Sequence, residues 1–123
     1  MASILLISPD SLWQGVVQEA LTPQHSVTIV ATLEEGIRHI QRGAYALIIA
    51  DILGLPSISE GLKVIQQMQP VARIVIVAVA PTWRIVREAF EHGAIDFAAK
   101  TFNAEEIQRL IENNLRKTPQ RLL

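Results

Sequence analysis

The amino-acid sequence predicts an α/β domain in which five parallel strands alternate with five helices. Short runs of aliphatic and β-branched residues alternate along the chain with longer segments whose apolar residues recur every three or four positions. Most of the short runs are apolar at consecutive positions, which predicts strands that are buried on both faces. With 123 residues, 50% of them hydrophobic, the chain has the size of one domain with a substantial core.

The expected elements follow one another in a regular order. We expect strands over residues 4–7, 26–31, 45–51, 73–79 and 95–99. We expect helices where apolar residues form a stripe, at Leu12/Val16/Ala20, Leu33/Ile37/Ile40, Leu62/Ile65/Met68, Val86/Ala89/Phe90 and Ile107/Leu110/Ile111/Leu115. A (βα)5 order with helices on both faces suits a doubly wound, flavodoxin-like sheet with strand order 2-1-3-4-5.

Residues typical of helix boundaries agree with these elements. A capping side chain stands three residues before a glutamate at Thr32/Glu35, Ser57/Glu60 and Asn103/Glu106. Asp10 is expected to cap the first helix, and Gly43 and Gly93 are expected to end the second and fourth in a left-handed conformation. We therefore interpret residues 1–117 as one domain and residues 118–123 as a C-terminal tail or the start of a linker.

Composition narrows the functional classes. A formal net charge of -1 and a pI near 6.3 give no broad basic surface for nucleic acid or an anionic membrane. The absence of cysteine excludes disulfides and thiolate metal sites. The N-terminal stretch MASILLISPD has no positively charged start and only a short apolar run, so we expect a cytoplasmic protein.

Polar residues are expected to meet at one edge of this sheet. Ligands in doubly wound folds bind beyond the carboxyl ends of the strands, next to the switch point between strands 1 and 3. Asp51 ends the third expected strand and Lys100 follows the fifth, so we expect the two to meet and to form an ion pair. The other residues at these strand ends are Ser8, Pro9 and Asp10, and Val79 to Pro81.

Two segments resemble response-regulator receiver domains of two-component systems: HGAIDFAAKTF (92–102) and LIIADILGLP (47–56). The resemblance covers essentially the whole chain. It implies phosphorelay signal transduction, in which an aspartate takes a phosphoryl group from a histidine kinase in the presence of Mg²⁺. Matched residue by residue, Asp51 is the phosphoacceptor, Lys100 pairs with the phosphoryl oxygens and Phe97 is the aromatic switch residue. The resemblance implies Asp10, Asp51 and the backbone carbonyl of Leu53 as the metal ligands.

The chain also departs from the family pattern. Ser8 and Pro9 stand where the family has an acidic pair, and Asp10 lies one position later. Val79, or Ala78 with a shift of one, replaces the Ser or Thr after the fourth strand. Thr101 replaces the proline after the lysine, and a trans bond is expected there because a cis bond before a non-proline residue costs roughly 3–4 kcal/mol. The loop after Asp51 looks longer than the family's.

These departures leave several functions open. The favoured one is a pseudo-receiver, a degenerate receiver that acts by protein–protein interaction and in which Asp51 and Lys100 form a structural pair. The alternative is a conventional receiver, phosphorylated on Asp51 with Mg²⁺ as its cofactor. A flavodoxin-like small-molecule domain is the least favoured, because no Gly-rich phosphate loop follows the first strand. We expect no enzymatic turnover beyond phosphoacceptor and weak autophosphatase activity.

A protein-binding face is expected on the last two helices. In the family, the face formed by helix 4, strand 5 and helix 5 docks partners or a second copy of the domain. An aromatic residue among mixed charges suits such an interface. The expected partner is a histidine kinase or an output domain, or a second copy in a homodimer, and the candidate residues are Trp83, Arg84, Arg87, Glu105 and Arg109. The three histidines, His25, His39 and His92, are given no role because they form no ligand spacing.

Overall fold

The computed structural model describes residues 1–119. Within this range, strands and α-helices alternate along the chain, with one short 3-10 helix, η1 (Ile52–Gly54), after the third strand. The strands are β1 (Ser3–Ile7), β2 (Ser26–Val30), β3 (Leu47–Asp51), β4 (Ile74–Ala78) and β5 (Asp96–Ala99). The helices are α1 (Ser11–Leu21), α2 (Leu33–Ile40), α3 (Ile58–Met68), α4 (Trp83–Glu91) and α5 (Ala104–Leu115).

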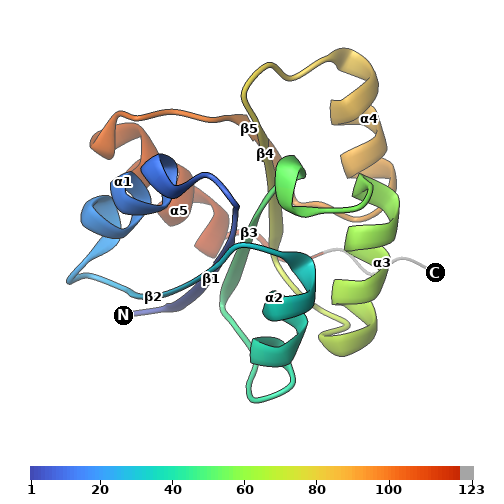
Figure 1. Ribbon diagram of the computed structural model, residues 1–123, viewed down its shortest axis with the longest axis horizontal. Coiled ribbons are helices and arrows are strands. Elements are labelled where there is room, and N and C mark those ends of the chain that lie inside the picture. The colour runs from blue at the N-terminus through green and yellow to red at the C-terminus, as the bar shows by residue number, and fades with distance from the viewer. Residues whose placement is uncertain (120–123) are drawn as a thin grey trace.

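The sheet is parallel and has the predicted order β2-β1-β3-β4-β5. Helices α1 and α5 cover one face, and α2, α3 and α4 cover the other (Figure 1). Each face has its own apolar cluster, one packed with α1 and α5 and one with α2, α3 and α4. The doubly wound fold predicted from the sequence is confirmed.

Burial differs between the middle and the edges of the sheet. All residues of β3 and β4 are buried, and so are four of the five in β1. The edge strands β2 and β5 are mostly half-buried, because each has only one neighbouring strand. Burial on both faces, expected for most of the strands, is therefore correct for the three central strands, whose carboxyl ends carry most of the candidate site.

The predicted stripe of the first helix was wrong at Leu12, whereas its Ala20 is buried and its Val16 packs against the core. The buried residues of α1 are Trp13, Val17, Ala20 and Leu21, whereas Leu12 is 69% exposed. One residue of a helix corresponds to a rotation of about 100°, and burying the large Trp13 removes more apolar area from water than burying Leu12 would. Two other stripe residues are also exposed, Met68 as the last residue of α3 and Phe90 near the end of α4.

The predicted helix caps are present. The side chains of Asp10, Thr32, Ser57 and Asn103 each accept a hydrogen bond from a backbone N–H in the first turn of α1, α2, α3 and α5, respectively. Gly93 follows α4 with a φ of 98°, a conformation that residues with a Cβ rarely adopt.

The other helix end differs from expectation. The φ of Gly43 is not positive, because α2 already ends at Ile40 and the chain continues in a right-handed turn at Gln41. Residues 120–123 of the predicted tail lie outside the described range. No helix within residues 1–119 is both long and apolar enough to span a membrane.

Candidate functional site

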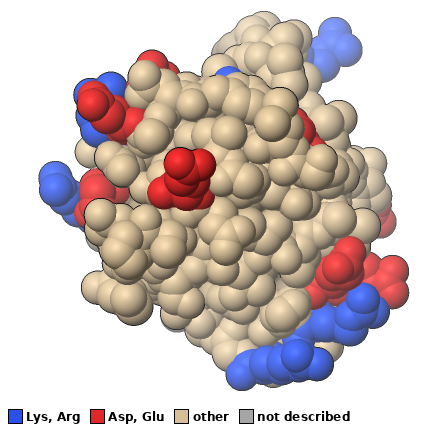
Figure 2. Space-filling model, turned by 60° about the vertical axis from the view of Figure 1, so that its left-hand side comes forward, with Lys and Arg blue, Asp and Glu red and all other residues tan. Residues whose placement is uncertain are grey.

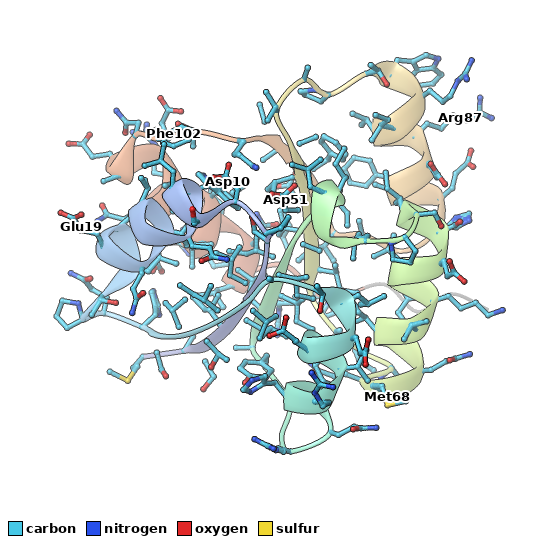
Figure 3. The ribbon with its side chains drawn as sticks, in the orientation of Figure 1. Asp10, Glu19, Asp51, Met68, Arg87 and Phe102 are labelled. Atoms are coloured by element: carbon cyan, nitrogen blue, oxygen red, sulfur yellow. The ribbon has the colours of Figure 1, made fainter. Side chains whose placement is uncertain are left out.

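The carboxyl ends of β1, β3 and β5 bring together the side chains that the sequence placed there. Ser8 and Asp10 follow β1, Asp51 is the last residue of β3, and Lys100 is the first residue after β5. Figure 3 shows Asp10 at the start of α1 close to Asp51 at the end of its strand. The distance from Lys100 Nζ to Asp51 Oδ2 is 2.7 Å, so the predicted ion pair is present.

Asp51 lies at the centre of this cluster and has no exposed surface. Its Oδ2 accepts hydrogen bonds from the Ser8 hydroxyl and from Lys100 Nζ, both at 2.7 Å. Its Oδ1 accepts the backbone N–H of Leu53 at 3.0 Å, which starts the turn of η1. Both carboxylate oxygens therefore already have partners within the protein, as a buried charge requires.

Lys100 carries the positive charge of the cluster, and only 2% of its side chain is exposed. Its Nζ also lies 3.1 Å from Asp10 Oδ2, so it bridges two carboxylates. Burial by itself lowers the pKa of Lys100, but the hydrogen bonds to Asp51 and Asp10 outweigh it, and the net effect raises the pKa above its usual 10.5. The ammonium therefore stays charged at neutral pH.

Asp10 joins the cluster to the first helix. Its Oδ1 accepts the backbone N–H of Trp13 at 3.1 Å, and its own N–H donates to the Ser8 hydroxyl at 3.2 Å. The hydrogen bond from Trp13, followed by that from Lys100, lowers the pKa of Asp10 below 3.8. The cluster thus contains two aspartate side chains and one ammonium group.

The remaining candidate site residues lie around this cluster. Val79, after β4, is 71% exposed and offers no hydroxyl, and Phe97 is half-buried against the core. Leu53 contacts Asp51 through its backbone N–H, and its side chain is 64% exposed. The bond between Lys100 and Thr101 is trans, as expected.

The predicted interface residues on α4 and α5 are exposed. Trp83 is 75% exposed, and the guanidinium of Arg87 lies 5.6 Å from the centre of its ring. Arg87 also forms an ion pair with Glu91 at 2.6 Å, and Figure 3 shows it at the outer side of α4. Arg84, Glu105 and Arg109 are exposed as well.

A second exposed surface borders the site on the side of α1. Leu12 is 69% exposed and Phe102, which follows β5, is 52% exposed. Figure 3 places Phe102 above the start of α1, near Asp10. When the left-hand side of the molecule is turned forward, most charged side chains in view lie toward the rim of the face (Figure 2). Helix α1 itself has a single charged residue, Glu19.

Sequence reasoning missed the contribution of Trp13. Its indole Nε1–H donates to the carbonyl of Thr101 at 2.9 Å, and its ring centre lies 5.2 Å from Lys100 Nζ. The signal was a tryptophan in the first turn after the capping Asp10, but the helical stripe was placed one residue away. His25, which was given no role, accepts the N–H of Ala2 and lies 2.9 Å from Glu112.

The fold and the cluster define a class of protein: a doubly wound α/β domain with a carboxylate and an ammonium paired at its switch point. The chain belongs to the response regulator receiver domain family, whose sequence profile matches residues 4–112. Members of this family interact with histidine kinases and output domains, and they typically bind Mg²⁺ in the active site.

The chain is similar to curated and structurally known response regulators. It is 27% identical over 115 residues to the probable C4-dicarboxylate response regulator DctR of Bacillus subtilis, a match that covers 89% of this chain and 50% of DctR. The chain thus spans about half the length of this relative.

Two solved structures have the same fold. A two-component response regulator from Clostridium difficile superposes with a TM-score of 0.85 and 22% identity, over 95% of this chain and 98% of that one. The second is the receiver domain of a sensor histidine kinase from Pseudomonas aeruginosa, with a magnesium ion coordinated in its active site cleft. It superposes with a TM-score of 0.80 and 22% identity, over 94% of this chain and 98% of that one. At these identities the two structures establish the fold alone.

The residues of this chain do not fit a Mg²⁺ site of the family's kind. Mg²⁺ needs oxygen ligands in near-ideal octahedral geometry. Here Lys100 Nζ lies between Asp10 and Asp51, within hydrogen-bond distance of both, so a metal ion bridging these carboxylates would meet another positive charge. The described residues contain no group of three or more His, Cys, Asp or Glu side chains placed to hold a metal.

Proposed function

We propose that this domain is a degenerate receiver that transmits signals by protein–protein interaction rather than through an aspartyl phosphate. The observation that carries the proposal is the state of Asp51, which has no exposed surface and whose two oxygens are satisfied by Ser8, Lys100 and Leu53. A phosphoacceptor must present a carboxylate oxygen to its phosphodonor as a nucleophile. In this chain that oxygen is held in an internal ion pair.

Three further features support the proposal. Ser8 and Pro9 supply no carboxylate after β1, and Asp10 is engaged as the cap of α1 and as a partner of Lys100. Val79 supplies no hydroxyl donor for the charge of a phosphoryl group. The geometry of the carboxylates does not suit Mg²⁺. The proposal accordingly includes no cofactor and no enzymatic turnover.

The proposed partner is a protein that recognises the folded surface of the domain. Exposed aromatic and charged residues on α4, among them Trp83 and Arg87, support an interface that uses helix α4, strand β5 and helix α5. The partner would be an output domain, a histidine kinase or a second copy of this chain, in the cytoplasm. Relatives of about twice its length support an output domain as one of these partners.

A specific observation also favours a second function, that of a conventional receiver phosphorylated on Asp51 by a histidine kinase. Asp51 and Lys100 match the family's phosphoacceptor and lysine, and Asp51 Oδ2 lies 2.7 Å from Lys100 Nζ at the carboxyl edge of the sheet. Phe97, matched to the switch residue, is on β5. For this function the pair between Asp51 and Lys100 would have to open and expose a carboxylate oxygen.

An NMR titration of ¹⁵N-labelled protein separates the two functions. Mg²⁺ is added first and then beryllofluoride, which imitates an aspartyl phosphate without requiring the right kinase, and Asp51→Asn is the control variant. The degenerate receiver predicts a folded spectrum that responds to neither addition. Saturable shifts at Asp51, Asp10 and Lys100 that spread to Phe97 and are abolished in Asp51→Asn would instead establish the conventional receiver.

A further inference from the structure

Trp13 links the first helix to the chain that follows Lys100. It lies in the first turn of α1, and 2% of its surface is exposed. Its indole N–H donates to the carbonyl oxygen of Thr101 at 2.9 Å, across 88 positions of sequence. The same ring lies 5.2 Å from Lys100 Nζ, within the range of a cation–π interaction.

A lysine needs such support to hold one geometry, because its charge lies at the end of a flexible four-carbon stem. The backbone N–H of Lys100 donates to the carbonyl of Ala78 at 2.8 Å, which fixes the residue to β4 on one side. On the other side, the carbonyl of Thr101 is held by Trp13. The backbone of Lys100 is thus fixed on both sides, and the ring of Trp13 lies beside its ammonium.

These contacts form a closed circuit of hydrogen bonds and covalent bonds. The backbone N–H of Trp13 donates to Asp10 Oδ1, and Asp10 Oδ2 accepts from Lys100. Lys100 is bonded to Thr101, whose carbonyl accepts the indole N–H of Trp13. The position of the lysine is therefore tied to the first turn of α1 through two independent contacts of one tryptophan.

We propose that Trp13 is a positioning residue that holds Lys100 against Asp51 and so keeps the site closed. This inference rests on the proposed function, in which the ion pair between Asp51 and Lys100 is the resting and permanent state. After the lysine, the chain is held at Thr101 by the hydrogen bond from Trp13. A tryptophan that only filled the core would still need a partner for its indole N–H, but that partner would not have to follow Lys100, and its ring would not have to lie beside the ammonium.

The test follows the ammonium of Lys100 by ¹⁵N NMR. A buried, hydrogen-bonded ammonium exchanges its protons slowly with water and gives a detectable Nζ signal. Trp13→Phe keeps an aromatic ring but removes the N–H donor, so proton exchange at Lys100 Nζ should be faster by about tenfold or more while the amide spectrum stays folded. Exchange within about twofold of the wild type would make Trp13 a core residue only and overturn the proposal.

Val17→Ala is the matched control. Val17 is buried in the same helix and the same apolar cluster as Trp13. Its aliphatic side chain can form neither a hydrogen bond nor a cation–π interaction with the lysine. This variant should lower stability and leave the exchange of Lys100 Nζ near the wild-type rate. If Val17→Ala accelerates the exchange as much as Trp13→Phe, general loosening of the core explains the effect and the proposal fails.

A measurement on the wild type keeps the test decisive if Trp13→Phe does not fold. The indole N–H of Trp13 and the ammonium of Lys100 should be protected to a similar degree relative to free tryptophan and lysine, because one opening event exposes both. The indole of Trp83, which is 75% exposed, serves as the unprotected reference. A protected Trp13 beside a freely exchanging Lys100 would overturn the proposal.

These experiments are made without Mg²⁺ or beryllofluoride, which keeps them separate from the test of the proposed function. If the wild type responds to beryllofluoride but Trp13→Phe still accelerates exchange, the degenerate-receiver proposal fails and the positioning role stands. If the wild type ignores beryllofluoride and Trp13→Phe leaves exchange unchanged, the positioning role alone fails.

Discussion

Two parts of the carboxyl edge of the sheet differ in how far their side chains are exposed. In the cluster at the start of α1, Asp51 and the side chain of Lys100 are at most 2% exposed and are paired with each other. In the segment that joins β4 to α4 and at the start of that helix, Val79 is 71% exposed and Trp83 is 75% exposed. The groups with reactive chemistry are thus engaged inside the protein, while the exposed segment is available to another molecule. Changes in the buried cluster should affect stability, and changes in the exposed segment should affect binding.

Removal of the Lys100 charge should have the largest effect on stability. In Lys100→Met, Asp51 would remain a buried carboxylate with only the Ser8 hydroxyl and the Leu53 N–H as partners. Breaking a buried ion pair from one side costs about 3–5 kcal/mol. Urea unfolding at pH 7 should show a free energy of unfolding lower by about that amount, or a protein that no longer folds.

The matched control is another lysine that pairs with an aspartate near β5. Lys117 Nζ lies 3.3 Å from Asp96 Oδ2, but the two side chains are 43% and 27% exposed. Lys117→Met should cost no more than about 1 kcal/mol, because water solvates both charges. Equal losses for Lys117→Met and Lys100→Met would mean that burial of the Asp51 pair adds nothing.

Ser8→Ala should have an intermediate effect. The hydroxyl donates to Asp51 Oδ2 and accepts the N–H of Asp10, so its removal leaves two polar groups short of one partner each. We expect a loss of about 1–3 kcal/mol in the free energy of unfolding. Ser11→Ala, at the exposed start of α1, is the control and should change it by less than about 0.5 kcal/mol. A Ser8→Ala variant as stable as the wild type would show that Lys100 alone satisfies the carboxylate.

The sequence was sufficient to predict the fold because its signals were local and repeated. Continuous apolar runs identified β1, β3 and β4, and capping side chains such as Thr32 and Ser57 fixed the starts of helices. The orientation of α1 was not predicted correctly, since Leu12 and Trp13 are both apolar and either could face the core. That choice depends on what the rest of the fold places opposite, which no local pattern encodes.

The sequence predicted which charged residues meet at the site, but not how they are packed there. Strand ends in a parallel sheet must meet at one edge, so Asp51 and Lys100 could be paired from position alone. The hydrogen bond that lies beside that pair joins Trp13 to Thr101, 88 positions apart in the sequence, and no local pattern predicts it. For Asp10, the sequence favoured a helix cap over a metal ligand, and the structure shows the cap.

The same cluster should make stability depend on pH, with a smaller effect than the substitutions above. The pKa of Asp10 is below 3.8 in the folded protein. Its contribution to the free energy of unfolding is therefore complete above pH 3.8 and is lost as the pH falls through the pKa of the folded state. The pKa of Lys100 is above 10.5 in the folded protein. Its contribution to the free energy of unfolding is therefore complete below pH 10.5 and is lost as the pH rises through the pKa of the folded state. Urea midpoints measured against pH should therefore decline at both extremes.

Asp10→Asn isolates the acid decline. Asparagine caps a helix about as well as aspartate, so the hydrogen bond from the N–H of Trp13 can be kept while the ionisable group is removed. The variant should lose part of the decline in acid. It should weaken the alkaline decline without abolishing it, because Asp51 and Asp10 both raise the pKa of Lys100 and only Asp51 remains charged in the variant. An acid decline as steep as that of the wild type would assign it to other carboxylates.

The exposed segment at the start of α4 should give the smallest change in stability and the clearest change in binding. Trp83→Ala removes a side chain that is 75% exposed and contacts Arg87, so the free energy of unfolding should change by less than about 0.5 kcal/mol. Arg84→Glu together with Arg87→Glu should be similarly mild for the fold but reverse the charge of this surface. If self-association in analytical ultracentrifugation, or binding of a partner protein, is unaffected in both variants, the α4 surface is not the interface. A loss of binding without a loss of stability would show that the buried cluster and the exposed segment have separate roles, the first stabilising the fold and the second binding a partner.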